Sequence, residues 1–291
     1  MNVIELLQTT PVMLLLVAAI LGLMVGSFLN VVVYRLPVIL QRDWQAQARD
    51  VLEVPQDETG EQQPFNLLWP PSRCQHCSAP VRAWQNIPVL SWLLLRGRCK
   101  ECGGRISLRY PLVEVASAAL SVLVAWQFGL SGQGIAMLVL TWGLLALSLI
   151  DADHQLLPDV LVLPLLWLGL LLNSFELFTS LQDAVYGAAF GYLSLWTVFW
   201  LFKLVTGKEG MGYGDFKLLA MLGAWGGWQV LPLTILLSSV VGAVLGVIIL
   251  RLQRQGMAQP LPFGPYLAIA GWIAIIWGEQ ITRSYLQFAG F

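Results

Sequence analysis

The chain has 291 residues, of which 57% are hydrophobic and 11% are charged, and its mean hydropathy is +0.70. Soluble globular domains carry about 25% charged residues, so this composition excludes an ordinary soluble protein and favours a polytopic membrane protein. The net charge of −1 gives no support to nucleic-acid binding, and we expect no nucleic-acid partner.

Eight apolar segments are predicted to be transmembrane helices, because about 20 apolar residues in a helix cross the hydrocarbon core. The first is residues 11–33. The other seven lie near 111–129, 133–150, 157–177, 183–204, 215–229, 230–250 and 265–286. The break between the sixth and seventh segments, at 226–229, is the least distinct. The sequence therefore predicts an all-α membrane protein with about eight spans.

Three parts follow from this layout: a first transmembrane helix in 1–37, a polar insert in 38–109 and a seven-helix membrane domain in 110–291. With eight spans, all but one of the sixteen basic residues fall on the insert's side, Arg283 being the exception. Basic residues gather on the cytoplasmic side of membrane proteins. We therefore expect a multi-pass protein whose insert faces the cytoplasm, in contact with membrane lipid.

The end of the first span carries small and polar residues. Gly22, Gly26 and Ser27 suit close helix packing, and Tyr34 and Arg35 suit an anchor at the membrane interface. A buried amide, Asn30, is the one residue of this stretch for which we suspect a further role.

The insert contains all four cysteines, in two Cys-x-x-Cys pairs: Cys74 with Cys77, and Cys99 with Cys102. Two such pairs can place four sulfurs around a zinc ion, and a glycine after the second pair permits a tight turn. A redox dithiol or a disulfide is the alternative. With four cysteines filling the shell, His76 is not expected to bind the metal.

Two aspartates lie at predicted membrane boundaries on the same side. Asp151 ends the third span, and Asp215 begins the sixth after the glycine-rich stretch that contains Gly212 and Gly214. Ionisable groups at such depths are costly and usually functional. Two facing carboxylates can share one proton and activate a water, which is the chemistry of an aspartyl protease. Alternatively, each aspartate serves only as a helix cap or dipole partner.

Other polar residues near the two aspartates have simpler explanations. Pro158 and Asp159 suit the first turn of the fourth span, and Asp153 and His154 suit a solvated loop. Lys217 either keeps a neighbouring carboxylate ionised or acts as an ordinary anchor.

With these motifs in order, the chain resembles the bacterial type IV prepilin peptidases, which are bifunctional leader peptidases and N-methyltransferases of the Gly-x-Gly-Asp membrane aspartyl protease class. The matching stretches are residues 26–30, 34–37, the two cysteine pairs, 109–114, 151–154, 157–159 and 212–217. They cover nearly the whole chain, and no motif departs from the family pattern.

The resemblance implies that Asp151 and Asp215 are catalytic, with Gly212, Gly214 and Lys217 supporting them. It implies cleavage of the basic leader of prepilins or pseudopilins after a glycine on the cytoplasmic side of the bacterial inner membrane. It also implies methylation of the new N-terminus with S-adenosylmethionine, served by the insert. Residues 96–98, Gly97 among them, are the only part of that site we can suggest.

Two other functions remain open from the residues alone. A cation-coupled transporter would use the two carboxylates to bind or relay ions, and a thiol oxidoreductase would use the cysteine pairs. The transporter leaves the cysteines without a role, and the oxidoreductase leaves the aspartates without one.

Overall fold

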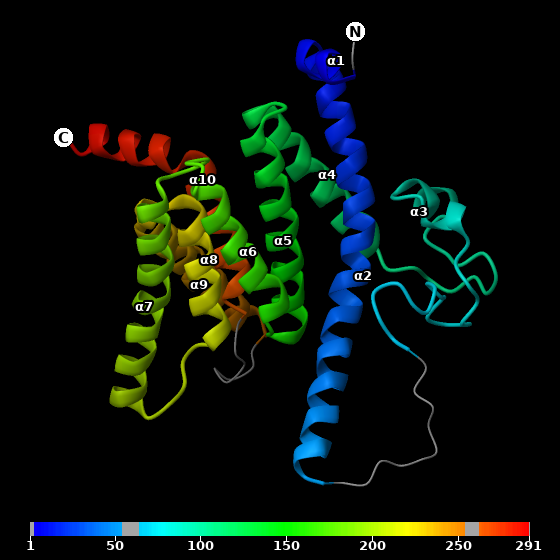
Figure 1. Ribbon diagram of the computed structural model, residues 1–291. Helices are drawn as coiled ribbons and strands as arrows, with labels where there is room; N and C mark the ends of the chain where they lie inside the picture. The colour runs from blue at the N-terminus through cyan, green and yellow to red at the C-terminus, as the bar shows by residue number, and fades with distance from the viewer. Residues whose placement is uncertain (1–2, 54–63, 254–261, 291) are drawn as a thin grey trace. The chain divides into compact units, whose positions relative to one another are not determined.

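The computed structural model describes residues 3–53, 64–253 and 262–290, and all regular structure in these residues is helical (Figure 1). The chain forms two compact units, Met1–Trp142 and Gly143–Phe291, which are described separately. The division into three parts predicted from the sequence stays a prediction.

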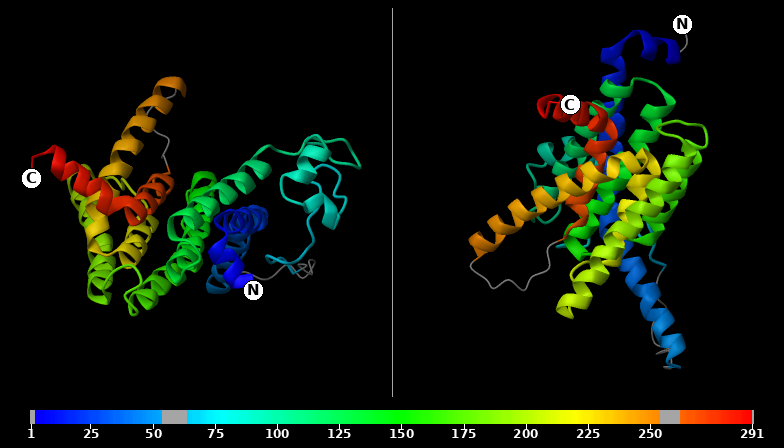
Figure 2. Two further views of the ribbon diagram at one scale, coloured as in Figure 1. Left: turned by 90° about the horizontal axis from the view of Figure 1, so that it is seen from above. Right: turned by 90° about the vertical axis from the view of Figure 1, so that its left-hand side faces the viewer.

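The first unit contains α1 (Val3–Thr9), α2 (Pro11–Val51), η1 (Ala83–Asn86), α3 (Leu90–Leu94), α4 (Arg109–Phe128) and the start of α5 (Gly132–His154). The two long helices α2 and α4 pack along each other, and the insert that joins them lies to one side (Figures 1 and 2). A Cβ at Gly22 would lie 2.6 Å from Cα of Ala118, and one at Gly26 would lie 2.7 Å from Cα of Glu114. The predicted packing role of these glycines is confirmed.

Helix α2 continues well beyond the predicted span. It passes through the buried Pro37 and ends at Val51, and residues 41–50 are exposed on every side. Strong helix formers such as Gln, Ala and Arg dominate this stretch, so helix propensity carries it on where apolar composition stops. A helix satisfies its own backbone hydrogen bonds, so this part of α2 can continue outside the membrane.

The second unit contains the rest of α5, α6 (Asp159–Asn173), α7 (Leu181–Thr206), α8 (Tyr213–Gly226), η2 (Trp228–Val230), α9 (Leu231–Gln253) and α10 (Gly264–Phe288). Helix α8 packs against α6, α7 and α10, and every residue from Asp215 to Trp225 except Lys217 is buried. With 14 residues it is about 21 Å long, shorter than the roughly 30 Å of an average hydrocarbon core, and other helices of the unit surround it. It is the central helix of this unit.

Close backbone approach fixes α7 and α6 against α8. A Cβ at Gly187 would collide with the carbonyl of Gly223, and a Cβ at Gly169 would lie 2.5 Å from the Trp225 ring. Small residues at helix contacts let membrane helices pack closely.

Each of the eight predicted segments coincides with one helix, and the weakest break is real, since α8 ends at Gly226 and Gly227 has φ of +79°. Among the described residues, four helices are long and apolar enough to cross a membrane: α2, α4, α5 and α7. Helix α6 and residues 228–244 are shorter apolar helices.

Candidate active site

Asp151 and Asp215 belong to the second unit and lie at helix ends. Asp151 is in the last turn of α5, and Asp215 is in the first turn of α8. Their exposed fractions are only 5% and 7%. Their charges are close enough to interact electrostatically. Two buried carboxylates at neighbouring helix ends are therefore the main feature of this unit.

A third helix end holds Asp151. The backbone N–H of Gly264, the first residue of α10, donates a hydrogen bond of 3.0 Å to Oδ2 of Asp151. The N-terminus of a helix favours negative charge, so α10 is well placed to stabilise an ionised Asp151. A Cβ at Gly264 would lie 2.7 Å from the same oxygen, so the approach requires a glycine.

Leu157, in the α5–α6 connection, packs between the two glycines next to the aspartates. A Cβ at Gly214 would lie 2.8 Å from Cβ of Leu157, and a Cβ at Gly264 would lie 3.3 Å from its Cδ2. The glycine before Asp215 and the glycine that holds Asp151 thus share one buried apolar neighbour. This contact joins the beginnings of α8 and α10.

Asp215 also makes a local contact with the backbone. The N–H of Asp215 donates to the carbonyl of Gly212, the N-cap of α8, over 3.3 Å, and a Cβ built at Gly212 would lie 3.7 Å from Oδ2 of Asp215. The carboxylate is thus in the first turn of its own helix, where the helix dipole favours it, which is the simpler role considered from the sequence. This position leaves the carboxylate able to act, so the two roles are compatible.

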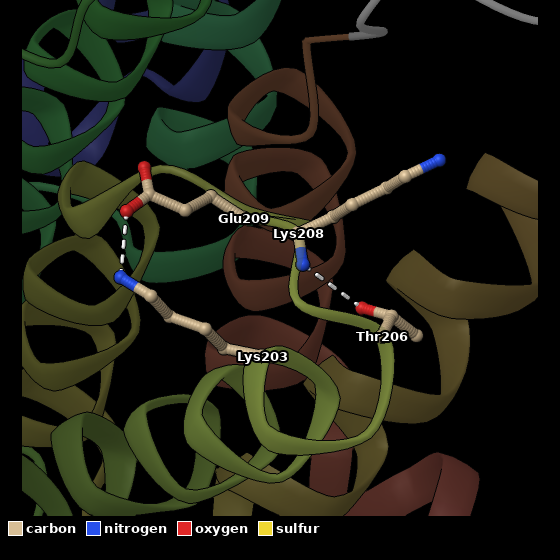
Figure 3. Close-up of polar contacts among 4 residues, drawn as sticks. All are labelled: Lys203, Thr206, Lys208 and Glu209. Carbon is tan, nitrogen blue, oxygen red and sulfur yellow. Dashed lines mark hydrogen bonds and ion pairs between the residues drawn. The ribbon is translucent and has the colours of Figure 1, made fainter.

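The loop before Asp215 is held at its start by polar contacts (Figure 3). Nζ of Lys203, in the last turn of α7, lies 2.8 Å from Oε1 of Glu209, and the Lys208 N–H donates to Oγ1 of Thr206 over 3.3 Å. The Lys208 side chain extends away from Glu209 (Figure 3). Gly207, with φ of +70°, ends α7 in the left-handed conformation.

An aromatic cluster fixes the first turn of α8 against α7. The ring centroids of Phe199, Tyr213 and Phe216 lie 5.2 to 5.6 Å apart, which is typical of favourable aromatic pairs. Because Asp215 lies between Tyr213 and Phe216 in the chain, this cluster fixes the backbone that carries it.

Lys217 pairs with the carboxylate predicted to be structural. Its Nζ lies 2.8 Å and 2.7 Å from the two carboxylate oxygens of Asp159, at the start of α6. The pair is partly exposed and links α8 to α6. Lys217 therefore forms an ion pair with a neighbouring carboxylate, but that carboxylate is Asp159 and neither Asp151 nor Asp215.

The four cysteines of the first unit come together as predicted. Their sulfurs all lie within 4.8 Å of one another, and those of Cys74 and Cys102 are 3.9 Å apart. Zinc–sulfur bonds of about 2.3 Å in a tetrahedron require sulfurs about 3.8 Å apart, so this cluster fits zinc. His76 is not part of the cluster and packs against Gly104.

Two similar turns present these sulfurs. In each turn the first cysteine N–H bonds to a carbonyl five residues later, and its carbonyl accepts an N–H from four residues later, Ser78 or Gly103. These two residues have φ of +58° and +71°, so the tight turn expected after the second pair is confirmed.

The pKa values of the Cys74 and Cys77 thiols are shifted in opposite directions. The N–H groups of Cys77 and His76 donate to the Cys74 sulfur and lower the pKa of that thiol to about 6. For Cys77 the Ala79 N–H acts in the same direction, but the Cys102 sulfur, desolvation and the other two sulfurs together outweigh it and raise the pKa of this thiol to about 12. Four adjacent thiols cannot all ionise alone, and a bound divalent cation would displace the remaining protons.

Gly97 has a structural role within the insert. Its φ is +65°, and a Cβ would lie 2.8 Å from the indole ring of Trp92. Its N–H and carbonyl bond to Trp92 and Ile106. These contacts alone account for a glycine at this position.

Two polar residues of α2 hold other parts of the first unit. Asn30 donates to the carbonyl of Tyr110 over 3.2 Å, at the start of α4. Arg35, expected as an interface anchor, is buried and donates to the carbonyls of Asn66, Leu67 and Pro70. Residues 66–70 therefore pack around this side chain, a contact that the local sequence does not reveal.

Comparison with known proteins agrees with this architecture. Residues 138–247 match the model of the type IV leader peptidase family, and residues 20–128 match that of the bacterial peptidase A24 N-terminal domain. Three proteins named prepilin leader peptidase/N-methyltransferase are similar over at least 99% of both chains. They come from Stutzerimonas stutzeri (67% identical), Pseudomonas aeruginosa (65%) and Dichelobacter nodosus (53%). The chain belongs to the type IV leader peptidase family. No solved structure matches it.

Membership of this family confirms the resemblance drawn from the motifs and gives no support to a transporter or a thiol oxidoreductase. Two polar contacts of this protein, those made by Gly264 and by Glu114, were not predicted from the sequence. Gly264 lies outside the matched region and was not connected with Asp151, although it stands between Phe263 and Pro265 at the start of a span. Glu114 was noted only as part of a motif, yet it is a buried carboxylate in a predicted span.

Proposed function

We propose that this protein removes the basic leader peptide from type IV prepilins or type II secretion pseudopilins and methylates the new N-terminal residue. The observation that carries this proposal is the 67% identity, over 99% of both chains, to a prepilin leader peptidase/N-methyltransferase. The buried aspartate pair supplies chemistry suited to the first step.

In this proposal Asp151 and Asp215 are the catalytic residues. One carboxylate is ionised and takes a proton from a water held between the two, and the resulting hydroxide adds to the scissile carbonyl carbon. The other carboxylate gives its proton to the carbonyl oxygen. The first then returns a proton to the leaving amine as the C–N bond breaks. The second takes back a proton from one hydroxyl of the collapsing intermediate, so both carboxylates regain their starting states and the protons balance.

The Gly264 N–H suits Asp151 to the role of the ionised base. A carboxylate that accepts a hydrogen bond at a helix N-terminus is stabilised in its charged form. Asp215 is then the acid, and the Gly212 contact and the aromatic cluster position it. Gly212 and Gly214 support the pair through the backbone, and Lys217 supports it indirectly by fixing α8 to α6.

For the second activity, the donor is S-adenosylmethionine, whose sulfonium methyl group passes to the nitrogen of the new N-terminus. We place this activity in the first unit with the insert, and keep Gly97 as the one residue suggested for it. Its contacts with Trp92 support a role in shaping the insert. Cys74, Cys77, Cys99 and Cys102 would hold a structural zinc ion, since four thiolates leave no open position for substrate.

The same proposal covers topology. We infer eight spans in the bacterial inner membrane, with the insert and the aspartate pair at the cytoplasmic side. Within the second unit, Lys203 in the last turn of α7 and Lys208 in the α7–α8 loop lie at the same helix ends as the aspartates, and Arg283 lies near the far end of α10. This agrees with the positive-inside rule.

The deciding experiment uses the full-length protein in detergent with a prepilin substrate and S-adenosylmethionine. We expect Asp151→Asn and Asp215→Asn to abolish cleavage, while Asp43→Asn, which changes an exposed carboxylate of α2, leaves it intact. Methyl transfer to a substrate supplied already cleaved should persist in both inactive variants. Cleavage by either variant at the normal rate would exclude the proposed aspartate chemistry.

A further inference from the structure

The insert exposes apolar side chains around α3. Ile87, Leu90, Leu93 and Leu94 are 46% to 68% exposed and fall within eight residues. Isolated exposed leucines are ordinary, but such a group on a small polar insert indicates a surface that is covered in the working protein. Residues 87–95 are called the α3 segment below.

The part of the insert that contains this segment is strongly basic. Between residues 64 and 109 there is one acidic residue, Glu101, against seven basic ones, all of them exposed. These are Arg73, Arg82, Arg96, Arg98, Lys100, Arg105 and Arg109. The chain's net charge of −1 conceals this local excess. Exposed apolar and basic residues together are the pattern of a segment that lies in an anionic membrane surface.

Hydrogen bonds fix the depth of the α3 segment. The N–H of Val89 donates to Oε2 of Glu114 over 2.7 Å, and the same carboxylate bonds to the side chain of Ser27. Glu114 is five residues into the apolar helix α4, about 7.5 Å from its start. Ser27 lies six residues before the end of the predicted first span, about 9 Å inside it. Val89 is therefore held beside the apolar parts of both helices.

This depth explains the buried Glu114. Backbone N–H groups in hydrocarbon need an internal partner, and the first turn of a helix has none of its own. The carboxylate supplies one for Val89, and the N–H groups of Ser91, Leu93 and Leu95 bond to carbonyls of the same segment. These N–H groups of the α3 segment thus have hydrogen-bond partners within the protein and can lie in an apolar environment.

We propose that the α3 segment is inserted into the membrane surface on the insert's own side, with its leucines among the acyl chains and the flanking arginines on anionic headgroups. The insert is then a membrane-embedded module, attached to the bilayer by this segment as well as by α2 and α4. This inference is independent of the peptidase assignment.

The test uses the full-length protein in lipid nanodiscs containing equal amounts of phosphatidylglycerol and phosphatidylethanolamine. A photoreactive benzoylphenylalanine replaces Leu94, and in a matched variant it replaces Ser72, an exposed residue of the same insert outside the segment. After irradiation, mass spectrometry of the labelled peptide identifies what has been cross-linked. Each variant is first checked for zinc content, so that a misfolded insert is excluded.

We expect phospholipid adducts at Leu94 at about tenfold the yield at Ser72, and phosphatidylglycerol adducts about twofold or more above those of phosphatidylethanolamine. Adducts at Leu94 to protein alone would show that another part of the chain or a second copy covers the segment, and would overturn the proposal. Equal lipid yields at the two positions would overturn it as well, and an excess of phosphatidylethanolamine would remove the role given to the arginines.

Discussion

The backbone N–H of Gly264 donates a 3.0 Å hydrogen bond to Oδ2 of Asp151, and this contact joins the end of α5 to the beginning of α10. The same glycine packs against Leu157, which also contacts Gly214 next to Asp215. The orientation of one aspartate and the backbone of the other thus depend on the same small group of residues. There is no space for a side chain at position 264, where the N–H meets the carboxylate of Asp151.

The first prediction concerns Gly264→Ala. The added Cβ would lie 2.7 Å from Oδ2 and 3.1 Å from Cγ of Asp151, so the carboxylate must move and lose its hydrogen bond. Displacing a catalytic group by about 1 Å can cost on the order of 100-fold in rate. We expect cleavage of prepilin to fall at least about tenfold, measured as initial rates in detergent.

Gly278→Ala is the control, because it changes a glycine of the same helix where the nearest atom to a new Cβ is a flexible leucine methyl group 3.8 Å away. Its activity and thermal stability should match those of the unaltered protein. If the Gly264 variant cleaved at the control's rate, Asp151 would not depend on this contact.

Helix positions could be predicted from the sequence because apolar length determines them, and each predicted span coincides with a helix. The continuation of α2 past Pro37 does not follow from apolar length, because it depends on helix propensity in a polar segment. The short α8 was read as a span of its own. Its burial among α6, α7 and α10 is a tertiary property that hydropathy does not contain.

The aspartates could be found because charge at the end of an apolar segment is visible locally, and the cysteine cluster because its spacing is regular. Gly264 could not be found in this way. It lies 113 residues from Asp151 in the chain, and only packing brings it close. The partners of Arg35 and Glu114 are likewise carbonyl and N–H groups of irregular loops, whose positions no periodicity predicts.

The second prediction tests whether Lys217 acts directly in catalysis or serves only as the ion-pair partner of Asp159. Because it pairs with Asp159 in a partly exposed site, Lys217→Met should lower stability by only about 0–1 kcal/mol. We expect the cleavage rate to stay within about threefold, and Asp159→Asn to behave in the same way, as expected for two partners of one exposed pair. Loss of cleavage in the lysine variant alone would give Lys217 a direct part in catalysis.

The third prediction concerns the cysteine cluster. Cys74→Ser removes one of four sulfurs that fit a zinc ion, so metal content should fall from about one ion per chain to well below one. The insert should then become sensitive to protease in residues 72–106, because metal binding contributes directly to the folding of small domains. The control is Ser72→Ala, which should keep both metal and protection.

Cleavage of prepilin should survive the Cys74→Ser change, because both aspartates belong to the second unit. Methyl transfer should fall with the metal content. Full metal content in the serine variant would show that the cluster does not bind zinc through this sulfur.

The last prediction concerns Asn173, a fully buried amide at the end of α6. Its Nδ2 donates to the carbonyls of Ala224 and Trp225, and its Oδ1 accepts from the N–H groups of Phe178 and Thr179. Asn173→Ala leaves two buried carbonyls and two partly buried N–H groups without these partners. Each such loss costs about 1–3 kcal/mol, and partial relaxation makes about 3 kcal/mol in total a reasonable expectation.

A loss of that size should lower the midpoint of thermal unfolding by roughly 6–12 °C for a unit of this length, whereas Asn86→Ala, at an exposed position of η1, should leave it unchanged. Asn173 contacts the end of α8 opposite to Asp215, about 15 Å along the helix axis. Well below the unfolding midpoint, the Asn173 variant should therefore still cleave prepilin at nearly the normal rate. An inactive but thermally stable variant would contradict this separation, because it would show that the far end of α8 controls the geometry of its first turn.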